Sequence, residues 1–213
     1  MNLPTKITFS RIIAIVLMII ALATMSLIPN WQTIELGNTG INLVFFIILI
    51  FFLLASFTDF LDGYLARKNN QVTDLGKFLD PVADKLLINS MVIFLIAPSL
   101  FAKYAPGQII SFNMWCALLL VARDIVVDAL RFIAAQKGVV IAANIFGKCK
   151  TVLEMVAISA VLLNGFPFNY FDKNWPVGLH IADFLVYIAT FVSVLSGIIY
   201  VVQNRHVFLP KGE

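Results

Sequence analysis

The chain has 213 residues, of which 61% are hydrophobic and 13% charged, whereas about a quarter of the residues of a typical soluble domain are charged. This composition, with a mean hydropathy of +0.94, excludes an ordinary soluble enzyme and predicts an integral membrane protein. The net charge of +3 is too small and too dispersed for a nucleic-acid-binding surface, so we expect no nucleic-acid partner.

Six stretches contain no Asp, Glu, Lys or Arg, and each is long enough to cross a bilayer, which takes about 17 to 25 apolar residues as a helix. They cover residues 12–34, 36–58, 86–102, 104–122, 155–171 and 184–204. The corresponding helical spans are predicted near 12–30, 40–67, 76–101, 105–135, 147–168 and 183–204. Residues 1–11 are predicted as a short amphipathic juxtamembrane helix. We therefore expect one all-α transmembrane domain over residues 1–213, with six spans.

Basic residues indicate how these spans are oriented. With six spans, both termini share one side of the membrane with the connections after the second and fourth spans. Thirteen of the 15 Lys and Arg residues fall on that side, and only Lys103 and Lys173 fall on the other. Because basic residues are enriched in cytoplasmic loops, we expect both termini to be cytoplasmic.

Four aspartates gather where the second span ends and the third begins. Asp59 and Asp62 are three residues apart and Asp80 and Asp84 are four apart, so each pair shares one helix face. Four carboxylates at a membrane boundary repel one another unless they are paired or bind a cation. Oxygen-only ligands favour Mg²⁺ or Mn²⁺, and Mg²⁺ commonly shares its shell with phosphates. The alternative is that they are solvated charges paired with neighbouring Lys and Arg residues.

Small residues accompany these carboxylates. Gly63, Ala66 and Gly76 leave space for a nucleotide or a pyrophosphate, and Arg67 could bind a phosphate in bidentate fashion. Taken alone, each small residue is better explained as a helix-packing position, and Arg67 has the alternative role of a cytoplasmic anchor.

The connection after the fourth span is also rich in charge. Arg123, Arg131, Lys148 and Lys150 could form a cationic recess for an anionic molecule, although an ordinary cytoplasmic loop would look the same. Within this connection, Asp128 precedes Arg131 by one helical turn and could form an intrahelical ion pair with it.

The pattern Asp59-x2-Asp62-Gly63-x2-Ala66-Arg67-x8-Gly76-x3-Asp80-x3-Asp84 resembles the signature of the CDP-alcohol phosphotransferase family at every fixed position. The resemblance implies a six-helix membrane enzyme, usually a homodimer, that binds a CDP-linked donor and a divalent metal at the cytoplasmic surface. It also implies roles for single residues. Metal-binding residues would be Asp59, Asp62, Asp80 and Asp84, with Asp84 also the candidate general base, and donor-binding residues would be Gly63, Ala66, Arg67, Thr73 and Gly76.

Three segments resemble the bacterial members that use glycerol 3-phosphate as acceptor: Asn2–Arg11, Asp80–Leu86 and Arg123–Arg131. Thr5, Asp124 and Asp128 depart from that pattern, which has Asn, Glu and Ser there. The resemblance implies phosphatidyl transfer from CDP-diacylglycerol to glycerol 3-phosphate in a bacterial cell membrane. Residues expected at the acceptor are Arg123, Arg131 and Lys148. Alternatives are a related enzyme using inositol phosphate, serine or phosphatidylglycerol as acceptor, or a divalent-cation transporter.

The topology can be tested by cysteine labelling in a chain whose two native cysteines are replaced. In sealed cells, an impermeant thiol reagent should label Asn38→Cys and Lys173→Cys. It should label Thr73→Cys and Lys137→Cys only after permeabilisation. Labelling of Thr73→Cys from outside would contradict the orientation.

Overall fold

A computed structural model describes residues 3–27, 36–37, 39–68, 73–96, 110–138, 145–172 and 174–205. The described part of the chain forms seven helices and no β-strand. They are α1 (Leu3–Leu27), α2 (Leu43–Lys68), α3 (Asp74–Ile96), α5 (Met114–Gln136), α6 (Ile145–Leu162), the short α7 (Asn169–Asp172) and α8 (Ile181–Gln203). The all-α expectation is therefore confirmed for these residues.

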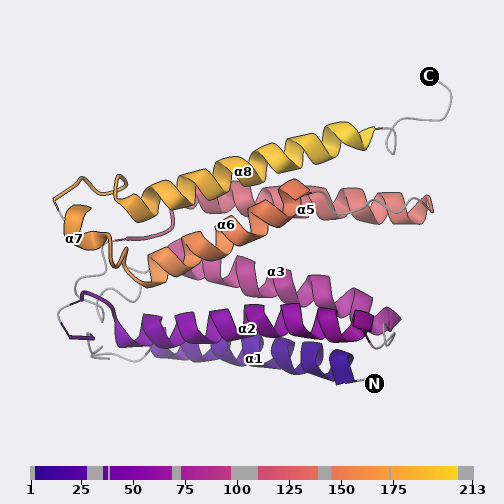
Figure 1. Cartoon of the computed structure of the whole chain (residues 1–213), viewed down its shortest axis with the longest axis horizontal. Coiled ribbons are helices and arrows are strands. Elements are labelled where there is room, and N and C mark those ends of the chain that lie inside the picture. The colour runs from indigo at the N-terminus through magenta and orange to yellow at the C-terminus, as the bar shows by residue number, and fades with distance from the viewer. Residues whose placement is uncertain are drawn as a thin grey trace.

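The six long helices form an elongated bundle (Figure 1). Helices α1 and α2 lie along one side, α5 and α8 along the other, and α3 and α6 between them. The start of α1 and the end of α8 lie at the same end of the bundle, and α7 lies at the opposite end. The end of α2, the start of α3 and the start of α6 also lie at the end of the bundle where α1 begins and α8 ends (Figure 1).

Helix α1 differs from the sequence prediction of a separate juxtamembrane helix followed by a first span. It runs without a break from Leu3 to Leu27. The reason lies in the sequence, which has no glycine or proline between Thr5 and Leu27. Pro4 falls in the first turn, where its missing N–H costs no helical hydrogen bond. The polar residues Thr5, Thr8 and Arg11 are therefore held rigidly on the same helix as the apolar stretch.

Apolar side chains cover much of the outer surface as well as the core. Leu54, Phe57, Phe191 and Ile198 are each more than half exposed, which a soluble protein would rarely combine in one surface. Among the described helices, Thr5–Thr24 and Ile181–Gln203 are long and apolar enough to cross a membrane, and Leu43–Asp59 forms a shorter apolar stretch. Membrane association is thus supported, while the full set of six spans remains a prediction.

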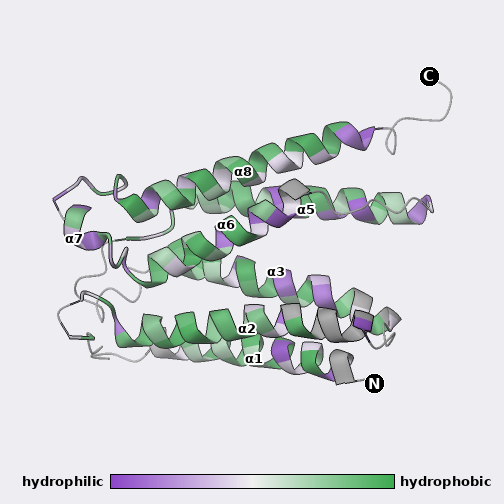
Figure 2. Ribbon diagram, in the orientation of Figure 1, coloured by the Kyte–Doolittle hydropathy of each residue, from purple (hydrophilic) through white to green (hydrophobic). Residues whose placement is uncertain are grey.

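Along the long axis of the bundle, one half is mainly apolar and the other half is more polar. A continuous core of residues such as Phe45, Phe52, Met91 and Ile158 joins α2, α3 and α6. The hydrophilic residues of α3, α5 and α6 lie in the half where α1 begins and α8 ends (Figure 2). The packed apolar core thus fixes the positions of the helices whose other half carries these polar side chains.

Candidate functional site

Three of the four predicted metal-binding aspartates have described side chains. Asp59 lies on α2, and Asp80 and Asp84 lie on α3. Asp59 is within electrostatic range of both Asp80 and Asp84. Among the described side chains, no group of three His, Cys, Asp or Glu residues has the spacing to hold a metal ion. The side chain of Asp62 lies outside the described residues, so the complete set stays a prediction.

Helix α1 contacts these carboxylates directly. The Nη1 atom of Arg11 is 2.5 Å from Oδ1 of Asp59, and the Arg11 side chain is 3% exposed. One turn earlier, the Thr8 hydroxyl donates a hydrogen bond of 2.9 Å to Oδ1 of Asp80. Arg11 and Thr8 are thus site residues that sequence reasoning did not select. The signal was their three-residue spacing in a helix beginning with polar residues, which puts both on one face.

Two predicted donor-binding residues shape the junction of α1 and α3. The Thr73 hydroxyl accepts a hydrogen bond of 3.0 Å from the Gly76 backbone N–H, so Thr73 caps the first turn of α3. The same hydroxyl is 2.8 Å from the hydroxyl of Thr5. A Cβ atom at Gly76 would lie 3.1 Å from the Thr73 hydroxyl, which makes glycine the residue that fits this close turn.

The remaining predicted donor-binding residues lie in the last turns of α2. Gly63 is half-buried there. The side chains of Ala66 and Arg67 lie outside the described residues, and their roles stay predictions.

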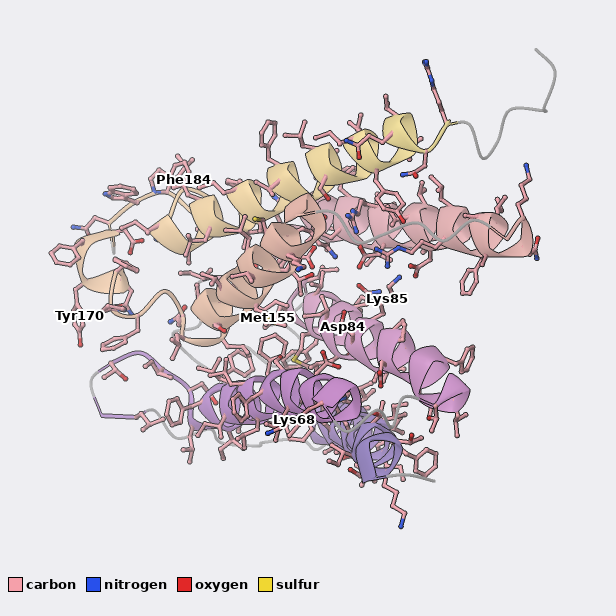
Figure 3. All side chains as sticks on the ribbon, turned by 45° about the vertical axis from the view of Figure 1, so that its right-hand side comes forward. Lys68, Asp84, Lys85, Met155, Tyr170 and Phe184 are labelled. Carbon is pink, nitrogen blue, oxygen red and sulfur yellow. The ribbon has the colours of Figure 1, made fainter. Side chains whose placement is uncertain are left out.

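A cavity of about 230 Å³ opens between α3, α5, α6 and α8. Five cationic and three anionic side chains contribute to its wall, which leaves a formal excess of two positive charges. They are Lys85, Arg123, Arg131, Lys148, Lys150, Asp84, Asp124 and Asp128. Figure 3 shows Asp84 and Lys85 on the side of α3 that faces α5. Asp84 therefore belongs both to the carboxylate group and to the cavity.

At the centre of the cavity wall, Asp124 links two cations. Lys150 of α6 donates to both of its carboxylate oxygens, at 2.8 and 3.0 Å, and Nη1 of Arg123 donates at 3.0 Å. Lys150 also pairs with Glu154 one turn later, at 2.8 Å. Asp124, Lys150 and Glu154 are each at most 6% exposed. Each of these buried charges thus has an oppositely charged partner, although both carboxylate oxygens of Glu154 and Nε of Arg123 have no hydrogen bond among the described residues.

Helix α8 supports Arg123 from the other side. The Nη2 atom of Arg123 donates a hydrogen bond of 2.7 Å to the Ser196 hydroxyl. At the neighbouring Gly197, a Cβ atom would come within 2.8 Å of Cγ of Arg123, so glycine leaves the space that the Arg123 side chain occupies. Sequence reasoning did not select Ser196 or Gly197, although a serine and a glycine within an otherwise apolar helix were the available signal.

The remaining cations differ in their contacts. Lys85 of α3 forms an ion pair with Asp128 of α5. The expectation that Asp128 could pair with Arg131 is therefore wrong. Nε of Arg131 donates instead to the Tyr200 hydroxyl at 3.1 Å, and its guanidinium lies over the Tyr200 ring at 5.4 Å. Lys148 is exposed on α6, and no carboxylate contact is described for Lys148 or Arg131.

Similar proteins are found over nearly the whole chain. The sequence pattern of CDP-alcohol phosphatidyltransferase matches residues 1–195. A Bacillus subtilis (strain 168) protein, named CDP-diacylglycerol--glycerol-3-phosphate 3-phosphatidyltransferase, is 40% identical over 204 residues, covering 95% of this chain and 95% of that protein. A Mycoplasma pneumoniae protein of the same name is 36% identical over 215 residues, covering 95% and 87% of the two chains. One from Rickettsia bellii is 33% identical over 201 residues, covering 93% of each.

The buried charges allow a stability test with two neighbouring lysines. Lys150→Met leaves Glu154 and part of Asp124 buried without their cation, and breaking a buried pair in this way typically costs about 3 to 5 kcal/mol. Lys148→Met, on the exposed side of the same helix, should change stability little. Thermal unfolding in detergent, followed by circular dichroism, measures both. Equal unfolding temperatures for the two variants would contradict the network described here.

Proposed function

The chain belongs to the CDP-alcohol phosphatidyltransferase family, and from this premise we propose that it is a phosphatidylglycerophosphate synthase. It transfers the phosphatidyl group of CDP-diacylglycerol to sn-glycerol 3-phosphate and releases CMP. The names of its Bacillus subtilis and Mycoplasma pneumoniae relatives support both substrates. The observation that carries the proposal for this chain is the small cationic cavity beside Asp84.

The charge and size of the cavity favour a phosphorylated acceptor. Its formal excess of two positive charges balances a phosphomonoester, which carries about −1.5 to −2 at neutral pH. Serine has no net charge to balance this excess. The volume of about 230 Å³ is also below the range of about 300 to 1,000 Å³ typical of drug-sized ligand sites, which suits a small metabolite better than phosphatidylglycerol.

Within this cavity we assign the phosphate to Arg123, Arg131 and Lys148. Arg131 and Lys148 have no described carboxylate contact, and Arg123 divides its donors between Asp124 and Ser196. Guanidinium groups suit phosphate because they present parallel N–H donors, whereas Lys148 acts as a point charge. The acceptor would thus be held with its hydroxyl end directed toward Asp84.

The carboxylates of α2 and α3 suit the donor diphosphate and a divalent ion. Asp59, Asp62, Asp80 and Asp84 offer only oxygen ligands, the set that Mg²⁺ and Mn²⁺ prefer. The electrostatic interaction of Asp59 with both Asp80 and Asp84 supports this assignment, since like charges so placed are stabilised by a cation. When bound, Mg²⁺ or Mn²⁺ would supply neutralisation of the diphosphate charge. The donor would contact Gly63, Ala66, Arg67, Thr73 and Gly76, with its acyl chains in the bilayer.

Asp84 is placed to act on the acceptor. It lines the cavity, so its carboxylate can accept the proton of the acceptor's primary hydroxyl. That oxygen forms a bond to the phosphorus that carries diacylglycerol, and the bond from this phosphorus to the CMP oxygen breaks. A carboxylate that also binds metal tightly is a weaker base. Because Asp84 belongs to both parts of the proposed site, its roles as metal ligand and as general base compete.

The site and both termini are assigned to the cytoplasmic side of a bacterial cell membrane. The asymmetry of the basic residues supports this, as does the position of the start of α1 and the end of α8 at one end of the bundle (Figure 1). The family resemblance further favours a homodimer. A cation transporter has less support, because the hydrophilic residues of α3, α5 and α6 gather toward one end of the bundle (Figure 2).

The reaction is tested with purified protein, CDP-diacylglycerol, Mg²⁺ and a panel of acceptors: glycerol 3-phosphate, inositol phosphate, serine and phosphatidylglycerol. Glycerol 3-phosphate should give phosphatidylglycerophosphate and CMP in equal amounts, and EDTA should abolish this reversibly. Asp59→Asn and Asp80→Asn should each lower turnover by about 10²-fold or more, because charge stabilisation in the transition state is lost. Full activity in EDTA, or in either variant, would contradict the metal assignment, and another preferred acceptor would contradict the reaction.

The acceptor contacts are tested by separate kinetic constants for the two substrates. Arg123→Ala should raise the KM for glycerol 3-phosphate about 10-fold to 150-fold, since a charged hydrogen bond contributes about 1.5 to 3 kcal/mol. Lys148→Ala should act in the same direction but more weakly. Arg205→Ala, exposed beyond the end of α8, provides the control and should leave both KM values unchanged. Equal increases for both substrates in Arg123→Ala would indicate a general structural defect.

A further inference from the structure

The three carboxylates of the cavity wall have different tasks. Asp84 is within electrostatic range of Asp59 of α2, and Asp124 is the buried partner of Arg123 and Lys150. Neither explains the third carboxylate, Asp128, which contacts Lys85 across the gap between α5 and α3. An anionic acceptor gains nothing directly from a carboxylate in its own cavity, so Asp128 needs a separate explanation.

The Lys85–Asp128 pair is more accessible than the Asp124 network. Both side chains are 28% exposed, whereas those of Asp124 and Lys150 are 7% exposed. Such a half-exposed pair adds little to stability, because solvent screens it and two long side chains must be ordered. The pair has a larger effect on ligand binding than on stability, since it occupies one of the five cationic side chains that line the cavity.

We propose that Asp128 sets the affinity of the acceptor site by masking Lys85. This inference rests on the proposed function, because it assigns Asp128 a role in binding the acceptor phosphate. While Asp128 holds the Lys85 ammonium, the phosphate meets Arg123, Arg131 and Lys148. Without Asp128, Lys85 becomes available at the wall next to Asp84, and the formal excess of positive charge rises from two to three.

The position of Lys85 makes this masking specific to the acceptor. Lys85 directly follows Asp84 in α3, and both line the cavity (Figure 3). A freed ammonium would therefore raise the positive potential of the cavity in which the acceptor phosphate binds, which strengthens binding without adding a contact to the acyl chains or cytidine of the donor. Removing a side chain would then improve acceptor binding, an outcome that structural damage does not produce.

The test is Asp128→Asn, which keeps the shape of the side chain and removes its charge. The KM for glycerol 3-phosphate should fall about threefold to tenfold, the size of a partly screened charge interaction, while the KM for CDP-diacylglycerol stays constant. The inhibition constant of inorganic phosphate should fall in parallel. Asp128→Glu keeps the charge and should retain a KM close to that of the unmodified chain.

A double variant identifies Lys85 as the masked group. In Lys85→Met/Asp128→Asn the gain should disappear, because no ammonium is released. An unchanged or higher KM for glycerol 3-phosphate in Asp128→Asn would overturn the proposal, as would an equal gain in the double variant. If Asp128→Asn does not fold, Asp128→Ser takes its place.

Phosphate binding separates this proposal from the proposed function. Calorimetry with inorganic phosphate alone requires no turnover, so tighter binding to Asp128→Asn than to the unmodified chain would support masking even if glycerol 3-phosphate were not the acceptor. Absence of turnover with glycerol 3-phosphate would instead overturn the reaction. Equal phosphate affinity in the two proteins would overturn the masking.

Discussion

The contact between Lys150 and Asp124 is the interaction on which the polar end of the bundle depends. It joins α6 to α5 through two hydrogen bonds in a place that is almost inaccessible to solvent. Asp124 then orients Arg123, which reaches Ser196 of α8. Three helices thus share one buried set of charges. Because a buried charge without a partner is strongly destabilising, these ion pairs favour the observed packing of α5 and α6.

The polar end consists of two half-sites that share Asp84. One is anionic and is formed by α2 and α3, with Arg11 and Thr8 of α1 contacting Asp59 and Asp80. The other is cationic and lies between α3, α5, α6 and α8. Opposite charge on the two sides of one reacting position suits the reaction we propose, in which one substrate carries a diphosphate and the other a phosphate.

Local sequence patterns predicted the helices, and they predicted which carboxylates share one helix face. Both predictions depend only on the length of an apolar stretch and on three- or four-residue spacing within a single helix. Contacts between helices could not be predicted in this way. The pair Lys85–Asp128 depends on how α3 and α5 are rotated, and the same rotation directs Arg131 to Tyr200 instead of to Asp128. The support of Arg123 by Ser196 and Gly197 likewise appears only when α8 packs against α5. The continuity of α1 was open to prediction, since its sequence has no helix breaker after Pro4.

In the site we propose, the acceptor phosphate binds in the cationic cavity while a metal binds at the carboxylates on the other side of Asp84. An experimental structure with Mn²⁺ and glycerol 3-phosphate, using anomalous scattering to locate the metal, tests both positions together. We expect a manganese ion contacting carboxylates of α2 and α3, with the phosphate within hydrogen-bonding distance of Arg123 and Arg131. A phosphate bound outside this cavity, or a manganese ion away from Asp59 and Asp80, would contradict it.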